Sequence, residues 1–221
     1  GASYGRCLTN TMDRSNGYER VAAEFLAGRG GPKSSGIGAG TVRAWARQLT
    51  SGATVLDLGC GSGLPITTVL LEAGLVVYGL DASPSFVAAF KHRFPETPIV
   101  CEAVEESSFF GRQFDAILAW GLMFLLSPPA QRAVIARIGR ALNSGGRLLF
   151  TSPPEAITWN DAMTGEESQS LGAAEYRRLL SAEGLAVLRE YEDEGQNHYY
   201  DAIKGTVAPA TPRRAVRGPE A

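Results

Sequence analysis

Apolar residues follow two alternating patterns along the chain, short continuous runs and stretches with helical spacing. The runs at residues 54–58, 75–80 and 114–120 are typical of buried strands, because a strand that is covered on both faces has no polar side. Helical spacing follows each run, and glycines or Ser-Pro pairs stand where the helices are expected to begin or end. This alternation predicts βαβ units, and therefore an α/β fold with helices on both faces of a parallel sheet.

The remaining elements complete this arrangement. Further strands are expected at residues 99–101, 147–151, 185–191 and 199–203, and helices at 18–26, 41–49, 64–73, 84–94, 128–142 and 173–182. The last two strands have no helix between them, which implies one antiparallel strand at the C-terminal end of the sheet. Residues 151–171 show neither pattern and are expected to form a loop.

Charge and composition narrow the classes of function. Lysine and arginine number 21 against 23 acidic residues, a net charge of −2, so the chain has no basic surplus for a nucleic-acid backbone. The longest apolar stretch, 116–126, is shorter than the roughly 20 residues of a membrane-spanning helix. Cys7, Cys60 and Cys101 are far apart and form no zinc motif, which favours a reduced, cytoplasmic protein without a bound metal. We therefore expect neither nucleic acid nor a membrane as a partner.

The strongest chemical signal is the glycine-rich turn after the first predicted strand. Gly59, Gly61 and Gly63 alternate with small residues, so a ligand can approach the backbone closely. The helix that follows presents free amides to an anionic group. Asp81 ends the second predicted strand, where a carboxylate can accept hydrogen bonds from both ribose hydroxyls of an adenosine group. Because ligands of open parallel sheets bind beyond the carboxyl ends of the strands, these residues predict a nucleoside site.

Two residues distinguish among nucleoside ligands. The dinucleotide fingerprint GxGxxG needs a glycine where this chain has Leu64. Asp57, just before the turn, would repel a pyrophosphate but suits a ligand with a positive ammonium group. The sequence thus favours a nucleoside with an amino-acid tail. Structural alternatives stay open, since Asp57 could bind amides of its own turn and Asp81 could cap the next helix, a role that Ser83 already suits.

Four segments in this order, 57–63 (DLGCGSG), Asp81, 101–105 (CEAVE) and 114–120 (FDAILAW), resemble those of class I S-adenosylmethionine-dependent methyltransferases. The resemblance covers about residues 21–204 and implies a Rossmann-like, doubly wound sheet of seven strands, of which only the last is antiparallel. It also implies S-adenosyl-L-methionine as the cofactor, with the glycine turn against its methionine part and Asp81 on its ribose.

The resemblance extends to other residues of the cofactor site. It places Ala103 and Val104 beside the adenine, with Glu102 where the family more often has aspartate, and Trp120 and Gly121 on the methionine side. Pattern and resemblance together predict as cofactor-binding residues Tyr18, Asp57, Gly59, Cys60, Gly61, Gly63, Asp81, Ala82, Glu102, Ala103, Val104, Trp120 and Gly121.

The chain divides into three parts on this interpretation. Residues 1–40 form an N-terminal helix and a glycine-rich lid segment, residues 41–206 the methyltransferase domain, and residues 207–221 a flexible tail without periodicity. Tyr18 lies on the helix that in this family folds over the cofactor, where it would either close the pocket or pack in the ordinary way.

Methyl transfer asks little chemistry of the protein, because the sulfonium already activates the methyl group and alignment is the main contribution. A base is needed only where the acceptor must lose a proton, and His198 is the histidine expected near an edge of the site. The alternative for His198 is an exposed position in a strand of packed aromatic residues. Met123, Phe124, Trp159 and Tyr199 are the candidates for contact with the acceptor.

A small-molecule acceptor is the preferred interpretation. The Ser-Pro-Pro triplets at 127–129 and 152–154 lack the position and the following aromatic residue of enzymes that methylate nucleobase amino groups. Cys60 and Cys101 are interpreted as small residues of a tight turn and of a buried strand, not as nucleophiles. Two alternatives stay open: a non-catalytic S-adenosylmethionine-binding module and an NAD-linked oxidoreductase. The sequence leaves the acceptor, the methylated atom and the oligomeric state open.

Overall fold

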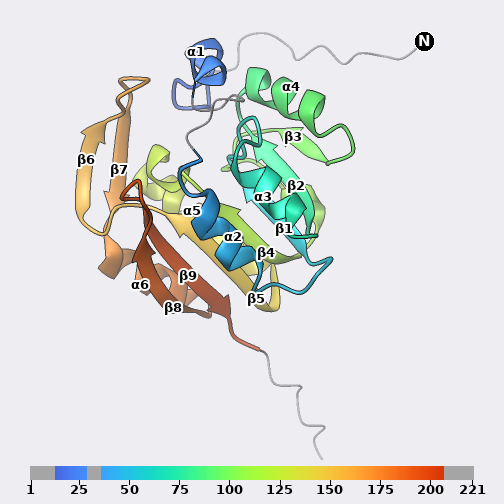
Figure 1. Ribbon diagram of the computed structural model, residues 1–221. Coiled ribbons are helices and arrows are strands. Elements are labelled where there is room, and N and C mark those ends of the chain that lie inside the picture. Colours follow the sequence, from blue (N-terminus) through green and yellow to red (C-terminus); the bar gives the residue numbers. More distant parts are fainter. Residues whose placement is uncertain (1–12, 29–35, 207–221) are drawn as a thin grey trace, which may run out of the picture.

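The computed structural model describes residues 13–28 and 36–206 (Figure 1). Cys7, part of the predicted lid segment and the predicted tail 207–221 lie outside these described residues. A sheet of seven strands forms the centre of the fold, in the order β3-β2-β1-β4-β5-β9-β8. Its strands are β1 Thr54–Leu58, β2 Val76–Asp81, β3 Ile99–Cys101, β4 Phe114–Ala119, β5 Leu142–Thr151, β8 Leu185–Glu192 and β9 His198–Lys204.

The directions of the strands confirm the predicted fold class. β9 is antiparallel to both of its neighbours, β5 and β8, and the other pairs in the sheet are parallel. The order reverses at β1, where β2 lies on one side and β4 on the other. The carboxyl ends of β1, β2 and β4 therefore meet at the topological switch point, which is where open α/β sheets bind ligands.

Helices cover both faces of the sheet. The helices are α1 Ala22–Ala27, α2 Ala39–Ala46, α3 Ile66–Glu72, α4 Pro84–Arg93, α5 Pro128–Ala141 and α6 Ala173–Ala182, with short 3-10 turns η1 Phe109–Gly111 and η2 Met123–Leu125. One buried cluster joins α2 and α3 to one face, and a second joins α5 and α6 to the other. None of the described helices is long and apolar enough to cross a membrane.

Helix capping follows the sequence signals. The Ser83 hydroxyl accepts a hydrogen bond from the Phe86 amide at the start of α4, and the Ser127 hydroxyl accepts one from the Ala130 amide at the start of α5. A proline stands at the first helical position in both cases, where its missing N–H leaves no bond unmade. Serine as the cap of α4 leaves Asp81 available for other contacts.

The segments that flank the sheet differ from the prediction. The loop expected at 151–171 contains an antiparallel hairpin, β6 Ala156–Asn160 and β7 Glu167–Leu171. The buried positions of β7 are occupied by Ser168 and Ser170, so this strand does not show the alternation of apolar and polar residues that identifies a strand in a sequence. At the N-terminus, turns replace the first half of the helix expected at 18–26. α2 begins before residue 41, so the predicted boundary at residues 40 and 41 falls inside a helix.

Candidate functional site

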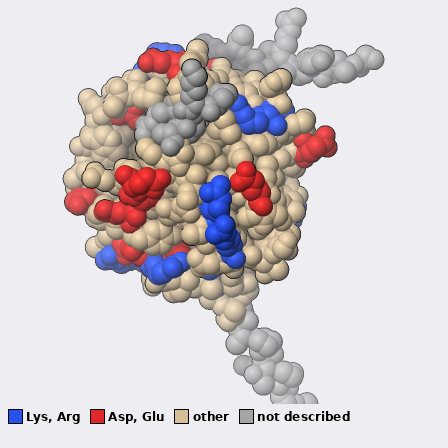
Figure 2. Space-filling view, viewed as in Figure 1, with Lys and Arg blue, Asp and Glu red and all other residues tan. Residues whose placement is uncertain are grey.

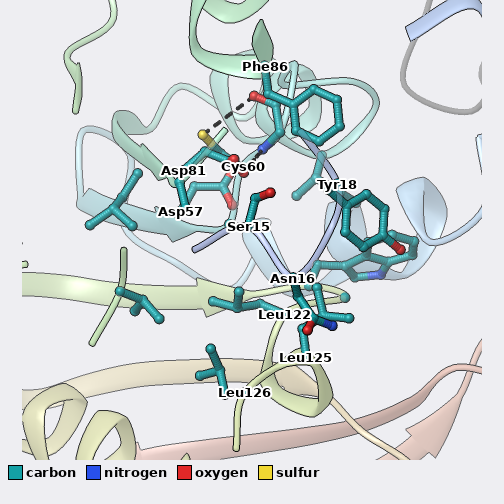
Figure 3. A pocket seen from close by; sticks show the side chains of 18 of the residues that line it. Ser15, Asn16, Tyr18, Asp57, Cys60, Asp81, Phe86, Leu122, Leu125 and Leu126 are labelled. Carbon is teal, nitrogen blue, oxygen red and sulfur yellow. Dashed lines mark hydrogen bonds between the residues drawn. The ribbon is translucent and has the colours of Figure 1, made fainter. Parts of the chain in front are cut away.

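A cavity of about 420 Å³ opens at the carboxyl ends of β1, β2 and β4 (Figure 3). The turn after β1 forms one side, and the segment after β4 forms the opposite side. An N-terminal strap, which we define as residues 13–27, and the turn of the β6–β7 hairpin also contribute. Twelve of the predicted site residues line the cavity: Tyr18, Asp57, Gly59, Cys60, Gly61, Asp81, Ala82, Glu102, Val104, Trp120, Gly121 and Phe124.

The glycine turn has backbone conformations that favour glycine. Gly61 has φ of +56°, and a Cβ at this position would meet no atom within 4 Å. Because Gly61 lines the cavity, its missing side chain leaves room for a ligand. Gly63 is different, since a Cβ there would lie 2.3 Å from Cε2 of Phe94. The predicted contact of Gly63 with cofactor gives way to a packing role, because this glycine lets α4 approach the turn.

Asp81 connects the glycine turn to the start of α4. Its Oδ2 accepts a hydrogen bond of 2.8 Å from the Gly61 amide, and its Oδ1 accepts one of 2.9 Å from the Ser83 amide. Both bonds fix the orientation of the carboxylate at the cavity wall. Burial raises the pKa of Asp81 to about 6, against the lowering effect of these amides.

Asp57 lies deeper, at the end of β1. It is 2% exposed, and its Oδ2 accepts a hydrogen bond of 2.7 Å from the Thr67 hydroxyl of α3. Burial, together with the nearby charge of Asp81, raises the pKa of Asp57 to about 7 despite this bond. Two carboxylates at one end of a cavity attract a cation, because a positive group offsets both the desolvation and the mutual repulsion.

The cysteines have different surroundings. Cys60 is buried in the glycine turn, and burial raises the pKa of its thiol above the ordinary value, so the thiolate is disfavoured. Cys101 is exposed at the end of β3, so the expectation that it is buried is wrong. The edge strand β3 has only three residues and one pairing neighbour, which leaves its last side chain uncovered.

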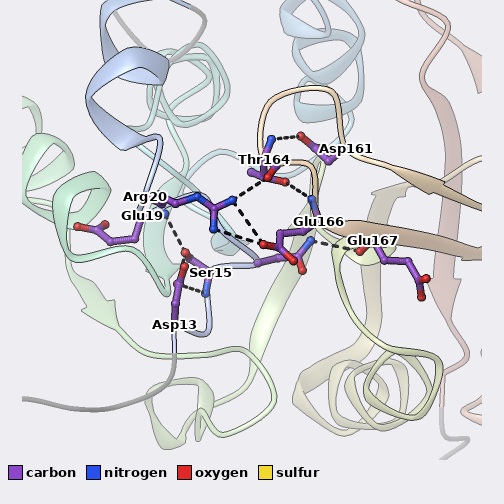
Figure 4. Close-up of polar contacts among 9 residues, drawn as sticks. Asp13, Ser15, Glu19, Arg20, Asp161, Thr164, Glu166 and Glu167 are labelled. Atoms are coloured by element: carbon purple, nitrogen blue, oxygen red, sulfur yellow. Dashed lines mark hydrogen bonds and ion pairs between the residues drawn. The ribbon is translucent and has the colours of Figure 1, made fainter.

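The N-terminal strap is hydrogen-bonded on two sides, and Figure 4 shows the bonds of Arg20 to the hairpin turn. On one side, Glu19 accepts hydrogen bonds from the hydroxyls of Ser83 and Ser85 at the start of α4. On the other side, the Tyr18 hydroxyl donates to Asp161 Oδ2 at 3.0 Å, and the Arg20 guanidinium donates to the Thr164 carbonyl at 2.7 Å. The strap thereby connects α4 to the β6–β7 hairpin and encloses the space between them.

The side of the cavity beyond β4 is apolar. Leu122, Leu125 and Leu126 line it, and Phe124 adds an aromatic ring. Trp159 of β6 packs on Phe124, with ring centroids 5.4 Å apart, and does not itself line the cavity. Met123 is fully buried in the core, because η2 turns its side chain away. Of the acceptor candidates, the structure therefore brings only Phe124 to the cavity.

A chain of hydrogen bonds holds Trp120 in the cavity wall. Its indole N–H donates to the Tyr199 hydroxyl at 2.8 Å, and that hydroxyl donates to Asp193 Oδ2 at 2.7 Å. Tyr199 is fully buried and does not line the cavity, so its predicted contact with the acceptor is replaced by support of Trp120. Asp193 belongs to the acidic turn between β8 and β9, over which red side chains gather in Figure 2.

His198 does not reach the cavity. It begins β9, where side chains alternate between the faces of the sheet, and its ring lies on the face opposite to that of Tyr199. Its Nε2 lies 3.0 Å from Glu190 Oε1 on the neighbouring strand β8. Among the described lining residues there is no histidine, and within the described part of the chain no three His, Cys, Asp or Glu side chains are grouped to bind a metal.

Some lining residues were not predicted from the sequence. Ala103 is buried and does not line the cavity, whereas Glu105, two residues later, does. Most of the other unpredicted residues belong to connections without regular periodicity or to the helices beside them, and they include Asp13, Arg14, Ser15, Asn16, Phe25, Ile37, Phe86, Leu122, Leu125, Leu126, Ser127, Asp161 and Asn197. The available sequence signal for Leu122, Leu125 and Leu126 was their position directly after a strand that ends at the site.

Comparisons with known proteins agree with this geometry. Residues 55–146 match a family model described as a methyltransferase domain. The chain is 32% identical over 153 residues to an uncharacterised methyltransferase of Synechocystis, covering 65% of this chain and 71% of that protein. It is 26% identical over 167 residues to the aklanonic acid methyltransferase of a Streptomyces strain, covering 69% of this chain and 67% of that protein.

A solved structure has a similar fold. It is the 1,6-didemethyltoxoflavin N1-methyltransferase of Burkholderia thailandensis, with bound 1,6-didemethyltoxoflavin and S-adenosylhomocysteine. The TM-score is 0.61 at 20% sequence identity, and the alignment covers 90% of this chain and 94% of that chain.

Proposed function

Because the chain belongs to the class I S-adenosylmethionine-dependent methyltransferases, we propose that its cavity holds S-adenosylmethionine beside a small-molecule acceptor. The observation that carries this assignment is the position of Gly61, whose absent side chain faces open space next to the oriented carboxylate of Asp81. A nucleoside needs both features, since its ribose offers two hydroxyl donors and its tail must pass close to the backbone.

The residues at this end of the cavity fit the cofactor. Asp81 would accept the ribose hydroxyls, and the buried Asp57 would favour the positive charges of the methionine part. Val104 gives an apolar surface and Glu102 an exposed carboxylate for the adenine. S-adenosylmethionine supplies a methyl group that is already activated by its sulfonium.

The chain's own contribution is to position the reactants and to exclude water. The strap covers the cavity through Glu19 on one side and Tyr18 on the other. Trp120 is part of the cavity wall and is held there by its hydrogen bond to Tyr199. Alignment of two bound reactants is the main source of rate in such a transfer, and no residue of the described cavity needs to act as a nucleophile.

A small acceptor is consistent with the dimensions of the site. The cavity volume of about 420 Å³ lies in the range of small-molecule pockets, and the strap and the hairpin enclose it. The relatives named above include methyltransferases of aklanonic acid and of 1,6-didemethyltoxoflavin, both of which are small molecules.

Incubation with S-adenosylmethionine and a cell extract tests this function. The extract is passed through a filter that retains macromolecules, and S-adenosylhomocysteine is quantified by mass spectrometry after incubation with each fraction. We expect its formation with the small-molecule fraction and not with heat-denatured protein. Formation with the macromolecular fraction alone would overturn the small-molecule assignment. Binding of S-adenosylmethionine without formation of any product would favour a non-catalytic binding module. Oxidation of NADH in the absence of S-adenosylmethionine would favour an oxidoreductase.

A further inference from the structure

The acceptor end of the cavity is separate from the carboxylates of the cofactor end. Leu122, Leu125 and Leu126 lie on the side of the cavity opposite to Asp57 and Asp81 (Figure 3). Phe25 of the strap and Ile37, just before α2, add further apolar surface to the lining. A ligand that fills this end must therefore carry a largely apolar body, because polar atoms pressed against these side chains would lose hydrogen bonds to water.

The turn after β6 brings the carboxylate of Asp161 to the cavity lining, two residues beyond Trp159, which packs on Phe124. Its Oδ1 accepts hydrogen bonds from the backbone amides of Met163 at 2.8 Å and Thr164 at 3.0 Å, which fix the carboxylate. Its Oδ2 accepts a bond of 3.0 Å from the Tyr18 hydroxyl, and the Thr164 side chain adds a further hydrogen bond to the carboxylate. A carboxylate oxygen can accept from two directions, so Oδ2 can receive a second donor from a ligand.

Asp161 is ionised at neutral pH. Partial burial raises its pKa, but the hydrogen bonds from Thr164, Met163 and Tyr18 together outweigh burial and place the pKa below its ordinary value. The carboxylate therefore offers a fixed negative charge at the edge of an apolar surface.

The other charged side chains of the described cavity lining are also mostly negative. Arg14 is the only cationic side chain of this lining, and it is paired with Glu106 at 2.6 Å and lies 3.8 Å from Glu105. Apart from Asp57 and Asp81, which are assigned to the cofactor, the acidic side chains of the lining are Asp13, Glu102, Glu105 and Asp161. An anionic acceptor would be repelled by this field, whereas a cation would be attracted.

Resting on the proposed methyltransferase function, we propose that the acceptor is an apolar amine whose nitrogen donates a hydrogen bond to Asp161. The apolar side chains bind the body of the molecule, and the Asp161 carboxylate selects its cationic group. This assignment concerns recognition, so the amine is the group that is bound, whichever atom receives the methyl group. Asp161 is thus a residue that determines specificity.

Matched probes of opposite charge test this inference. Tryptamine and indole-3-propionate share one apolar body, as do phenethylamine and 3-phenylpropionate, and each pair differs in an ammonium or a carboxylate. Each probe is titrated calorimetrically into protein saturated with S-adenosylhomocysteine. We expect each amine to bind at least about tenfold more tightly than its carboxylate partner, the factor given by about 1.4 kcal/mol. In Asp161→Asn, which keeps the size and one oxygen acceptor, this preference should fall markedly, and the remainder should reflect the other acidic side chains of the lining.

Glu166→Gln is the matched control. Glu166 lies in the same hairpin turn and pairs with Arg20 at 3.3 Å, but it does not line the cavity, so its amide should leave the preference unchanged. Equal or tighter binding of the carboxylates, no binding of either probe in both pairs, or an unchanged preference in Asp161→Asn would overturn the inference. If S-adenosylhomocysteine itself fails to bind, the proposed function fails, and titration of the same probes into the free protein still decides the role of Asp161.

Discussion

Replacement of Gly61 by valine is expected to weaken binding of S-adenosylhomocysteine by up to about 100-fold. The added side chain would project into the open space of the cavity, where the structure places no atom within 4 Å of the new Cβ. Overpacking of a filled site costs up to about 3 kcal/mol, which corresponds to about 100-fold in affinity. Calorimetric titration measures the affinity, and circular dichroism reports whether the fold is retained.

Gly111→Val separates this loss from backbone strain. Gly111 has φ of +62°, close to the +56° of Gly61, and a Cβ there also meets no atom within 4 Å. It does not line the cavity. Both variants should therefore lose a similar amount of stability, about 1–2 kcal/mol for a left-handed residue with a side chain, while only Gly61→Val loses affinity. Equal affinity losses in both variants would assign Gly61 to the turn alone.

Removal of the Asp81 carboxylate is expected to weaken binding of the same ligand by about 2–4 kcal/mol. Two charge-assisted hydrogen bonds contribute about 1.5–3 kcal/mol each, and water in the variant compensates for part of their loss. The change corresponds to roughly 30- to 700-fold in the dissociation constant. Because Asp81→Ala also leaves the Gly61 and Ser83 amides without their acceptor, the variant should lose about 1–3 kcal/mol of stability.

Asp115→Ala is the control for that loss. Asp115 accepts a backbone hydrogen bond of 2.9 Å from Thr54 and one of 2.9 Å from Asn143, but it does not line the cavity. Removal of the Asp115 carboxylate should lower stability without changing the affinity for S-adenosylhomocysteine.

The affinity of the wild type for S-adenosylhomocysteine should also fall as the pH drops below about 6, because protonation of Asp81 replaces an acceptor by a donor. A pH-independent affinity, or one unchanged in Asp81→Ala, would exclude the carboxylate from the site.

The central part of the fold was predictable from the sequence because its signals are local. Strand β1 was predicted with the bounds that the structure gives, and the capping of α4 by Ser83 follows from one Ser-Pro pair. The glycine turn and Asp81 were predictable for the same reason, since the turn directly follows the apolar strand β1 and Asp81 ends the apolar strand β2.

The covering elements were not predictable in the same way. The hairpin β6–β7 buries Ser168 and Ser170, and polar residues in a short segment are also typical of loops. The strap is held by side-chain bonds such as Tyr18 to Asp161, which are 143 residues apart in the sequence. Such contacts depend on the whole fold and leave no periodic pattern.

His198 illustrates the limit set by strand alternation. The expectation placed it at the correct edge of the sheet, because β9 begins beside the end of β5. The face on which its side chain lies depends on the register of β9. A shift of one residue would turn the His198 side chain from Glu190 on β8 to the opposite face of the sheet. The sequence does not fix that register, so the edge was predictable and the side was not.

Titration of S-adenosylhomocysteine and of NAD into the wild-type protein distinguishes a methyltransferase cofactor site from a dinucleotide site. We expect one equivalent of S-adenosylhomocysteine to bind per chain, with an affinity that Gly61→Val and Asp81→Ala reduce, and NAD to produce no binding heat under the same conditions. Binding of NAD in place of S-adenosylhomocysteine, or no binding of either, would contradict this expectation.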